Sequence, residues 1–110
     1  MKIPKADKAV IAKDKLCEYL LNPVHRRGSS KAKLLLSMGY SADDWQRLET
    51  DLRVHHLVAD VDCETDSDYG KRYEIVAPLL DENGGQVLFR SIWQTDIGTD
   101  FPRLITMYPE

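Results

Sequence analysis

Residues 22–33 bring together side chains that bind anions and transfer protons. This segment contains His25, followed at once by Arg26 and Arg27, and then Lys31 close to the start of a helical pattern. An imidazole both accepts and releases protons near neutral pH. Guanidinium groups match the oxygens of a phosphate, and the first turn of a helix offers free N–H groups to an anion. The segment therefore has the groups needed to bind a phosphodiester and to move a proton on it.

Two serines precede this helical pattern, and either Ser29 or Ser30 is expected to cap the helix. Arg26, Arg27 and Ser30 are the candidate substrate-binding residues. The alternative is an exposed basic loop in which His25 only covers the end of a helix, an arrangement that is common on protein surfaces.

Further candidates lie in the two predicted strands nearest the C-terminus. Arg90 shares a strand face with the apolar residues Leu88 and Ile92. An arginine in such surroundings usually forms an ion pair or binds a ligand, because burying its charge alone is costly. Thr106 and Tyr108 are two residues apart on one face of the last strand, so their hydroxyls can point together toward a ligand. Packing between strands would explain the tyrosine equally well.

Other polar groups have simpler explanations. His55 and His56 are adjacent, so on a helix they point about 100° apart and cannot share a metal ion. One of them is expected to complete an apolar stripe and the other to face solvent. Acids also recur at every second position over residues 60–68, where they form either a solvated strand face or a surface for a basic partner. These acids are Asp60, Asp62, Glu64, Asp66 and Asp68.

No recognised motif for a metal or a cofactor occurs. Cys17 and Cys63 form no CxxC pattern, and the chain has no Gly-rich phosphate loop, G-x-S-x-G elbow or H-E-x-x-H. The sequence therefore predicts no metal ion and no cofactor. It gives no support to nucleotide hydrolysis, esterase or zinc-protease chemistry.

The elements that must position these side chains are helices first and strands afterwards. Apolar spacing and capping residues predict helices over residues 14–21, from 29 or 30 to about 38, and from 41 to the two histidines. Period-two patterns predict strands over residues 57–64, 72–79, 86–95 and 103–108, with an Asn-Gly hairpin turn at 83–84. This order predicts an α+β fold: a small antiparallel meander of about four strands, with the N-terminal helices packed on one face.

Length and charge limit the class of protein. A chain of 110 residues predicts one domain over residues 1–110, and no apolar run approaches the ~18 residues of a membrane span. We therefore expect a soluble, cytoplasmic protein with no membrane partner. The net charge is −3, yet residues 1–40 carry nine Lys and Arg against three acids, whereas residues 41–110 carry six against fifteen. This balance argues against non-specific coating of DNA but permits a local basic site on an acidic body.

The chain resembles an uncharacterised bacterial domain family of about this length. The resemblance rests on an L-L-N-x-x-H-x-x-G-x-x-K-A string over residues 20–32 and a T-x-Y-P ending over residues 106–109. That family is associated with toxin modules, either free-standing or at the ends of larger secreted and phage-head proteins. Its layout of helices followed by a meander is similar to the superfamily of small ribonucleases that includes barnase, EndoU, tRNA-cutting colicins and RelE.

This resemblance implies a toxin-like endoribonuclease that needs no metal, with transfer RNA as one candidate substrate. In such enzymes the 2′-hydroxyl attacks the adjacent phosphorus, which leaves a cyclic phosphate and a free 5′-hydroxyl. The resemblance implies that His25 is the acid or the base and that Lys31 stabilises the developing charge. It further implies that Arg90, Thr106 and Tyr108 grip the phosphate. The implied partners are RNA and a cognate immunity or antitoxin protein.

Two other functions fit the same sequence. One is a non-catalytic binding module of antitoxin or immunity type, which would use the acidic residues of 60–68 to meet a basic surface. The other is a structural domain of a phage particle, which predicts oligomers rather than cleavage.

Overall fold

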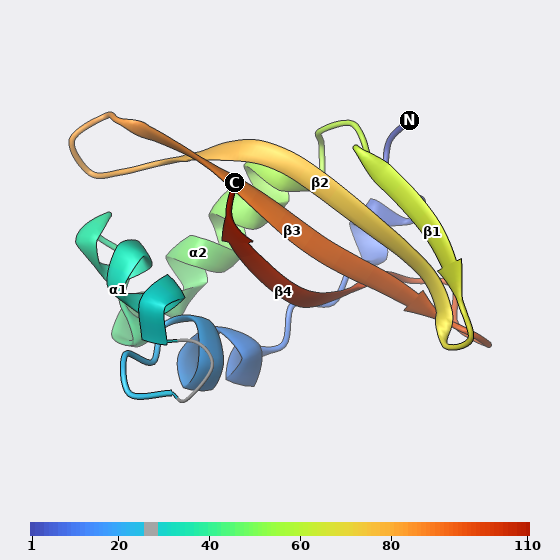
Figure 1. The fold of residues 1–110 in the computed structure, drawn as a ribbon, viewed down its shortest axis with the longest axis horizontal. Helices are drawn as coiled ribbons and strands as arrows, with labels where there is room; N and C mark the ends of the chain where they lie inside the picture. Colours follow the sequence, from blue (N-terminus) through green and yellow to red (C-terminus); the bar gives the residue numbers. More distant parts are fainter. Residues whose placement is uncertain (26–28) are drawn as a thin grey trace.

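The chain folds into short helices and then into a four-stranded sheet, as the computed structural model shows for residues 1–25 and 29–110 (Figure 1). The helical elements are η1 (Ala6–Lys8), η2 (Lys15–Leu20), α1 (Ser29–Ser37), η3 (Ala42–Asp44), α2 (Trp45–Asp51) and η4 (Leu52–His56). The strands are β1 (Cys63–Ser67), β2 (Gly70–Leu80), β3 (Gln86–Asp96) and β4 (Arg103–Pro109). The predicted α+β class is confirmed, with the helices preceding the sheet.

The sheet is an antiparallel meander with the strand order β1-β2-β3-β4, so β1 and β4 are its two edges. The long β2–β3 hairpin turns where the Asn-Gly pair predicted it. There, the carboxylate of Asp81 accepts hydrogen bonds from the backbone N–H groups of Asn83 and Gly85 at 2.9 and 2.7 Å. Gly84 has a φ of 85°, a conformation that favours glycine.

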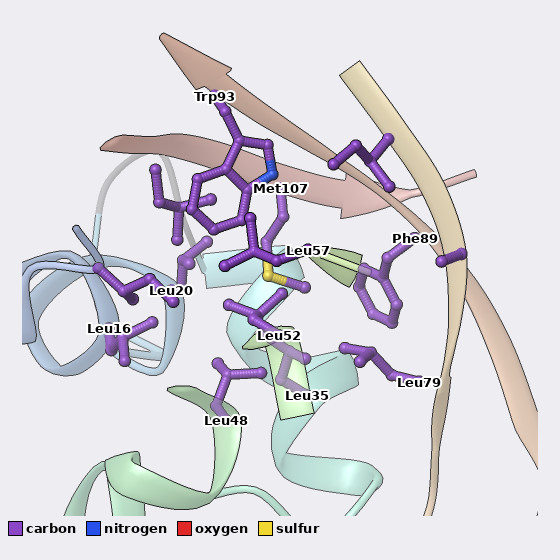
Figure 2. Close-up of a cluster of buried hydrophobic side chains, with 14 of the residues drawn as sticks. Leu16, Leu20, Leu35, Leu48, Leu52, Leu57, Leu79, Phe89, Trp93 and Met107 are labelled. Atoms are coloured by element: carbon purple, nitrogen blue, oxygen red, sulfur yellow. The ribbon is translucent and has the colours of Figure 1, made fainter. Parts of the chain in front are cut away.

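The core lies between the sheet and the helices that cover one of its faces (Figures 1 and 2). Trp93, Phe89 and Met107 project from the sheet and are completely buried. The helical segments and the residue directly after η4 supply a layer of leucines against them: Leu16, Leu20, Leu35, Leu48, Leu52 and Leu57. This packing fixes η2, α1 and β4 relative to one another, and these three elements carry the candidate site described below.

The first predicted strand is wrong in position. Residues 57–62 do alternate between more and less buried side chains, but β1 begins only at Cys63. Leu57 follows η4 directly and closes it, because its N–H donates to the carbonyl of Leu52 at 3.0 Å. Beyond it, the segment makes one isolated bridge between Lys2 and Asp60 instead of a ladder. Alternating burial thus arose here without the neighbouring strand that a sheet requires.

One histidine of the adjacent pair, His56, is completely buried, whereas His55 is half-buried. The Nδ1 atom of His56 lies 2.7 Å from the Ser91 hydroxyl, which also accepts a hydrogen bond from the Trp93 indole. Within residues 1–25 and 29–110, its Nε2 atom makes no hydrogen bond. Burial disfavours the charged ring and lowers the pKa of His56 to about 4.

We therefore expect acid to destabilise the fold through His56. Between pH 6.5 and about pH 4 the unfolded chain binds a proton at this residue that the folded chain does not bind. The free energy of unfolding should fall by about 3 kcal/mol across that window, relative to a variant without this histidine. Urea unfolding of wild-type and His56→Gln protein at several pH values measures the difference. Equal pH dependence of the two proteins would contradict the expectation.

Candidate active site

Three polar side chains from distant parts of the chain meet in one cluster. The ammonium of Lys31 donates hydrogen bonds to the Tyr19 hydroxyl at 2.7 Å and to the Thr106 hydroxyl at 3.0 Å. The two hydroxyls lie 3.2 Å from each other. We call Tyr19, Lys31 and Thr106 the Lys31 cluster. Since lysine is only a donor, both hydroxyl oxygens must act as acceptors toward it.

Each member of the Lys31 cluster is positioned by buried neighbours on its own element. Tyr19 lies in η2, where the N–H of Leu21 bonds to the carbonyl of Leu16, five residues back, as in a π-helix. Such helices are rare and often occur at functional sites. Lys31 precedes the buried residue Ala32 in α1, and Thr106 precedes the buried Met107 in the edge strand β4.

His25 lies beside this cluster. Its ring packs edge-on against Tyr19, with ring centroids 4.9 Å apart. A hollow of about 390 Å³ is lined by Lys15, Tyr19, His25, Ile105 and Thr106. His25 and the last strand therefore face the same hollow. A second hollow, of about 430 Å³, shares Lys15, Tyr19 and His25 with the first and is also lined by Ala12, Asp14 and Glu18.

Two lysines shape the electrostatics of Tyr19. The Nζ atoms of Lys31 and Lys15 lie 5.0 and 5.4 Å from the centre of its ring. Partial burial by itself raises the pKa of Tyr19. The hydrogen bonds with Lys31 and Thr106, together with both lysine charges, outweigh that effect and leave the pKa below its usual value of 10.0. The site thus favours the phenolate more than water does.

The structure brings four of the expected site residues together: His25, Lys31, Thr106 and Tyr108. Tyr108 is 37 % exposed, and the Lys31 Nζ lies 6.0 Å from the centre of its ring. Ser30 is the second residue of α1 and is exposed. Arg26 and Arg27 lie outside the described residues.

Arg90 occupies a different environment from the one expected of a phosphate ligand. Its guanidinium donates to Glu110 at 3.1 and 2.9 Å, to Asp62 at 2.9 Å and to Glu74 at 3.0 Å. These carboxylates, Glu110 above all, raise its pKa above the usual value. Although Arg90 pairs with Tyr108 across β3 and β4, its hydrogen bonds go to carboxylates rather than to the Lys31 cluster. We therefore leave Arg90 out of the proposed machinery.

The acids of residues 60–68 are largely neutralised within the chain. Four of the five pair with its own cations: Asp60 with Lys2, Asp62 with Arg90, and Glu64 and Asp66 with Lys71. Only Glu64 and Asp66 belong to β1, so the five acids do not line one strand. A single acidic strand face, as the binding-module interpretation requires, is not formed.

Sequence reasoning missed Tyr19 and Lys15. In the predicted helix over residues 14–21, the spacing of Leu16, Tyr19 and Leu20 is typical of a buried face, and both leucines are indeed completely buried. Tyr19 lies at the border of that face, where its ring packs and its hydroxyl reaches polar partners. The signal that could have found it is general: a buried tyrosine hydroxyl needs a hydrogen-bond partner.

Two further observations concern metals and membranes. In residues 1–25 and 29–110, no group of three or more His, Cys, Asp or Glu side chains lies where it could hold a metal ion. Across the same parts of the chain, no helix has the length and apolar character needed to cross a bilayer.

The fold and the site define a small α+β module with a histidine and a lysine-bound tyrosine around one hollow. The chain belongs to the family described as a domain of unknown function (DUF6883), whose model matches residues 2–110. Among curated proteins, no sequence matches it. A solved structure with a similar fold comes from a contact-dependent growth inhibition toxin–immunity protein complex of Klebsiella pneumoniae 342. The TM-score is 0.67 at 13 % identity, and the match covers 92 % of this chain and 99 % of the other.

Proposed function

We propose that this protein is a toxin-type endoribonuclease that cleaves RNA without a metal ion. The observation that carries the proposal is the hollow shared by His25 and the last strand, whose wall contains Tyr19 and Thr106, the two residues that hold the Lys31 ammonium. A proton-transfer group and a fixed cation around one cavity are what phosphodiester cleavage by an internal hydroxyl requires.

The proposed reaction is attack of a ribose 2′-hydroxyl on the adjacent phosphorus. His25 exchanges a proton with the substrate, and the Lys31 ammonium stabilises the negative charge that develops on the phosphate oxygens. The hydroxyls of Thr106 and Tyr108 bind those oxygens from β4. The products are a 2′,3′-cyclic phosphate and a free 5′-hydroxyl.

A role in a toxin–immunity pair, as the toxin or as the immunity protein, has support from the fold. The similar structure belongs to a growth inhibition toxin–immunity complex, although an identity of 13 % speaks for the fold alone. The proposal includes membership of the superfamily of barnase, EndoU, colicins and RelE. It also includes a cognate immunity protein as a binding partner. Residues 1–40, which contain His25 and the two lysines beside Tyr19, also carry the basic part of the sequence.

Purified protein incubated with total RNA in EDTA tests the proposal. We expect cleavage that chelation does not prevent, fragments that end in cyclic phosphate and begin with 5′-hydroxyl, and growth arrest when the protein is overproduced. Fragment ends are read by their reactivity toward phosphatase and kinase. Absence of cleavage, or its loss on chelation, would overturn the proposal. Capture of one dominant protein without any cleavage would instead favour the non-catalytic binding module.

A further inference from the structure

Cleavage by an internal 2′-hydroxyl needs two proton transfers, and His25 can perform only one of them in each turnover. One group must take the proton of the attacking 2′-hydroxyl, and another must give a proton to the departing 5′-oxygen. Besides His25, the described lining of the 390 Å³ hollow offers two proton donors, Tyr19 and Lys15. Of these two, only Tyr19 is held in place by side-chain hydrogen bonds with other described residues. Ile105 has no exchangeable proton, and the Thr106 hydroxyl is a very weak acid.

We propose that Tyr19 is the general acid, which leaves His25 as the general base. This assignment rests on the proposed function and adds a catalytic residue to it. Tyr19 lines both hollows and is in ring contact with His25, so one substrate phosphate placed there can meet both groups. The Lys31 ammonium, 2.7 Å from the phenol oxygen, is already in place to stabilise the phenolate that proton donation would leave.

Hydrogen bonding around the phenol oxygen suits a donor role. That oxygen accepts one hydrogen bond from Lys31 and can accept a second from Thr106, which lies 3.2 Å away. With both acceptor positions filled in this way, the phenol hydrogen is left to point at the substrate. The three-centre contact also fixes the direction of the hydroxyl before the substrate arrives, which lowers the cost of reaching the transition state.

The other tyrosines with perturbed acidity behave in the opposite way. Burial and nearby acids raise the pKa of Tyr73, and burial and Asp51 raise the pKa of Tyr40. At Tyr19 the lysines and Thr106 reverse this trend, so its phenol is a stronger acid than an ordinary tyrosine. A protonated group of increased acidity is suited to protonating an alkoxide leaving group.

The step balances without any co-reactant. His25 takes the 2′-hydroxyl proton, the 2′-oxygen forms its bond to phosphorus, and the bond from phosphorus to the 5′-oxygen breaks. The 5′-oxygen leaves with its electron pair and takes the Tyr19 proton. The enzyme is left as imidazolium and phenolate, which return to the starting state by exchanging one proton through solvent.

A change of leaving group tests this role. After the cleavage site has been mapped with wild-type protein, the same RNA is prepared with sulfur in place of the bridging 5′-oxygen at that site. A thiolate leaves without protonation. We expect Tyr19→Phe to slow cleavage of ordinary RNA roughly 100-fold, the lower bound typical of a general acid, and to change cleavage of the sulfur-containing RNA only a few-fold. Tyr69→Phe, which removes the hydroxyl of a tyrosine that is 75 % exposed, is the matched control.

A second measurement uses only wild-type protein and so does not depend on how the variant folds. Because ionised phenol cannot donate, cleavage of ordinary RNA should decline at alkaline pH, whereas cleavage of the sulfur-containing RNA should lack that decline. Equal loss on both substrates in Tyr19→Phe, no loss on ordinary RNA, or equal alkaline declines in the wild type would overturn the role of Tyr19 alone. Failure of the wild-type protein to cleave either RNA would overturn the proposed function itself.

Discussion

Replacing His25 by alanine is expected to lower the rate of RNA cleavage at least ~100-fold, the lower bound for a group that transfers a proton in the transition state. Alanine removes the imidazole from the hollow that it shares with Ile105 and Thr106, and neither of these two neighbours can take the 2′-hydroxyl proton in its place. Single-turnover cleavage in EDTA, with enzyme in excess over RNA, isolates the chemical step from product release.

Another histidine of the chain, His55, provides the control for this substitution. His55→Ala removes a half-buried imidazole from η4, outside the site, and should leave the cleavage rate within a few-fold of wild type. Thermal unfolding shows whether His25→Ala still folds. A folded His25→Ala protein that cleaves RNA at the wild-type rate would remove His25 from the mechanism and, with it, the main reason to regard the hollow as an active site.

Much of the sheet could be predicted from local patterns. The alternation of residues 72–79, 86–95 and 103–108 predicted three strands to within two residues of their observed ends, and the Asn-Gly pair located the hairpin between two of them. Such patterns succeed because one face of each strand is buried. The prediction of the first strand failed because residues 57–62 have the same alternation but no partner strand. Strand pairing depends on chain segments far away in sequence, which a local pattern does not reveal.

The candidate site was predictable only where its residues are close in sequence or carry a recognisable motif. His25 and Lys31 stand six residues apart, and the two-residue spacing of Thr106 and Tyr108 places their hydroxyls on one face of the last strand. Whether His25 and Lys31 meet the residues of the last strand depends on the packing of η2, α1 and β4. Tyr19 was missed for the same reason, because its hydroxyl partners lie 12 and 87 residues further along the chain.

Arg90 shows the converse limit. An arginine among apolar residues is expected either to form an ion pair within the chain or to bind a ligand. Arg90 follows this rule, but the sequence could not distinguish the two outcomes. Three carboxylates meet the guanidinium in the fold, from the segment before β1, from β2 and from the chain end. A charged residue in the sequence therefore need not be free to bind a ligand. Lys31 differs from Arg90, because its hydrogen-bond partners among the described residues are neutral hydroxyls.

Replacing Lys31 by alanine is expected to lower the cleavage rate ~100- to 1,000-fold, as removal of a single charge-stabilising donor typically does. The ammonium is held by Tyr19 and Thr106 at 2.7 and 3.0 Å, so it is oriented before the phosphorane charge develops. The same single-turnover assay measures the loss. Lys33→Ala is the matched control, because it removes an exposed lysine from the same helix and should have little effect.

The sulfur-containing RNA separates the role of Lys31 from that of Tyr19. Negative charge develops on the phosphate oxygens whichever atom leaves, so Lys31→Ala should slow both substrates. Tyr19→Phe should slow only the one with an oxygen leaving group. If Lys31→Ala instead lost activity on ordinary RNA alone, the lysine would act only by tuning the Tyr19 phenol, and charge stabilisation at the phosphate would have to come from another residue. Wild-type rates for a folded Lys31→Ala protein would contradict both roles.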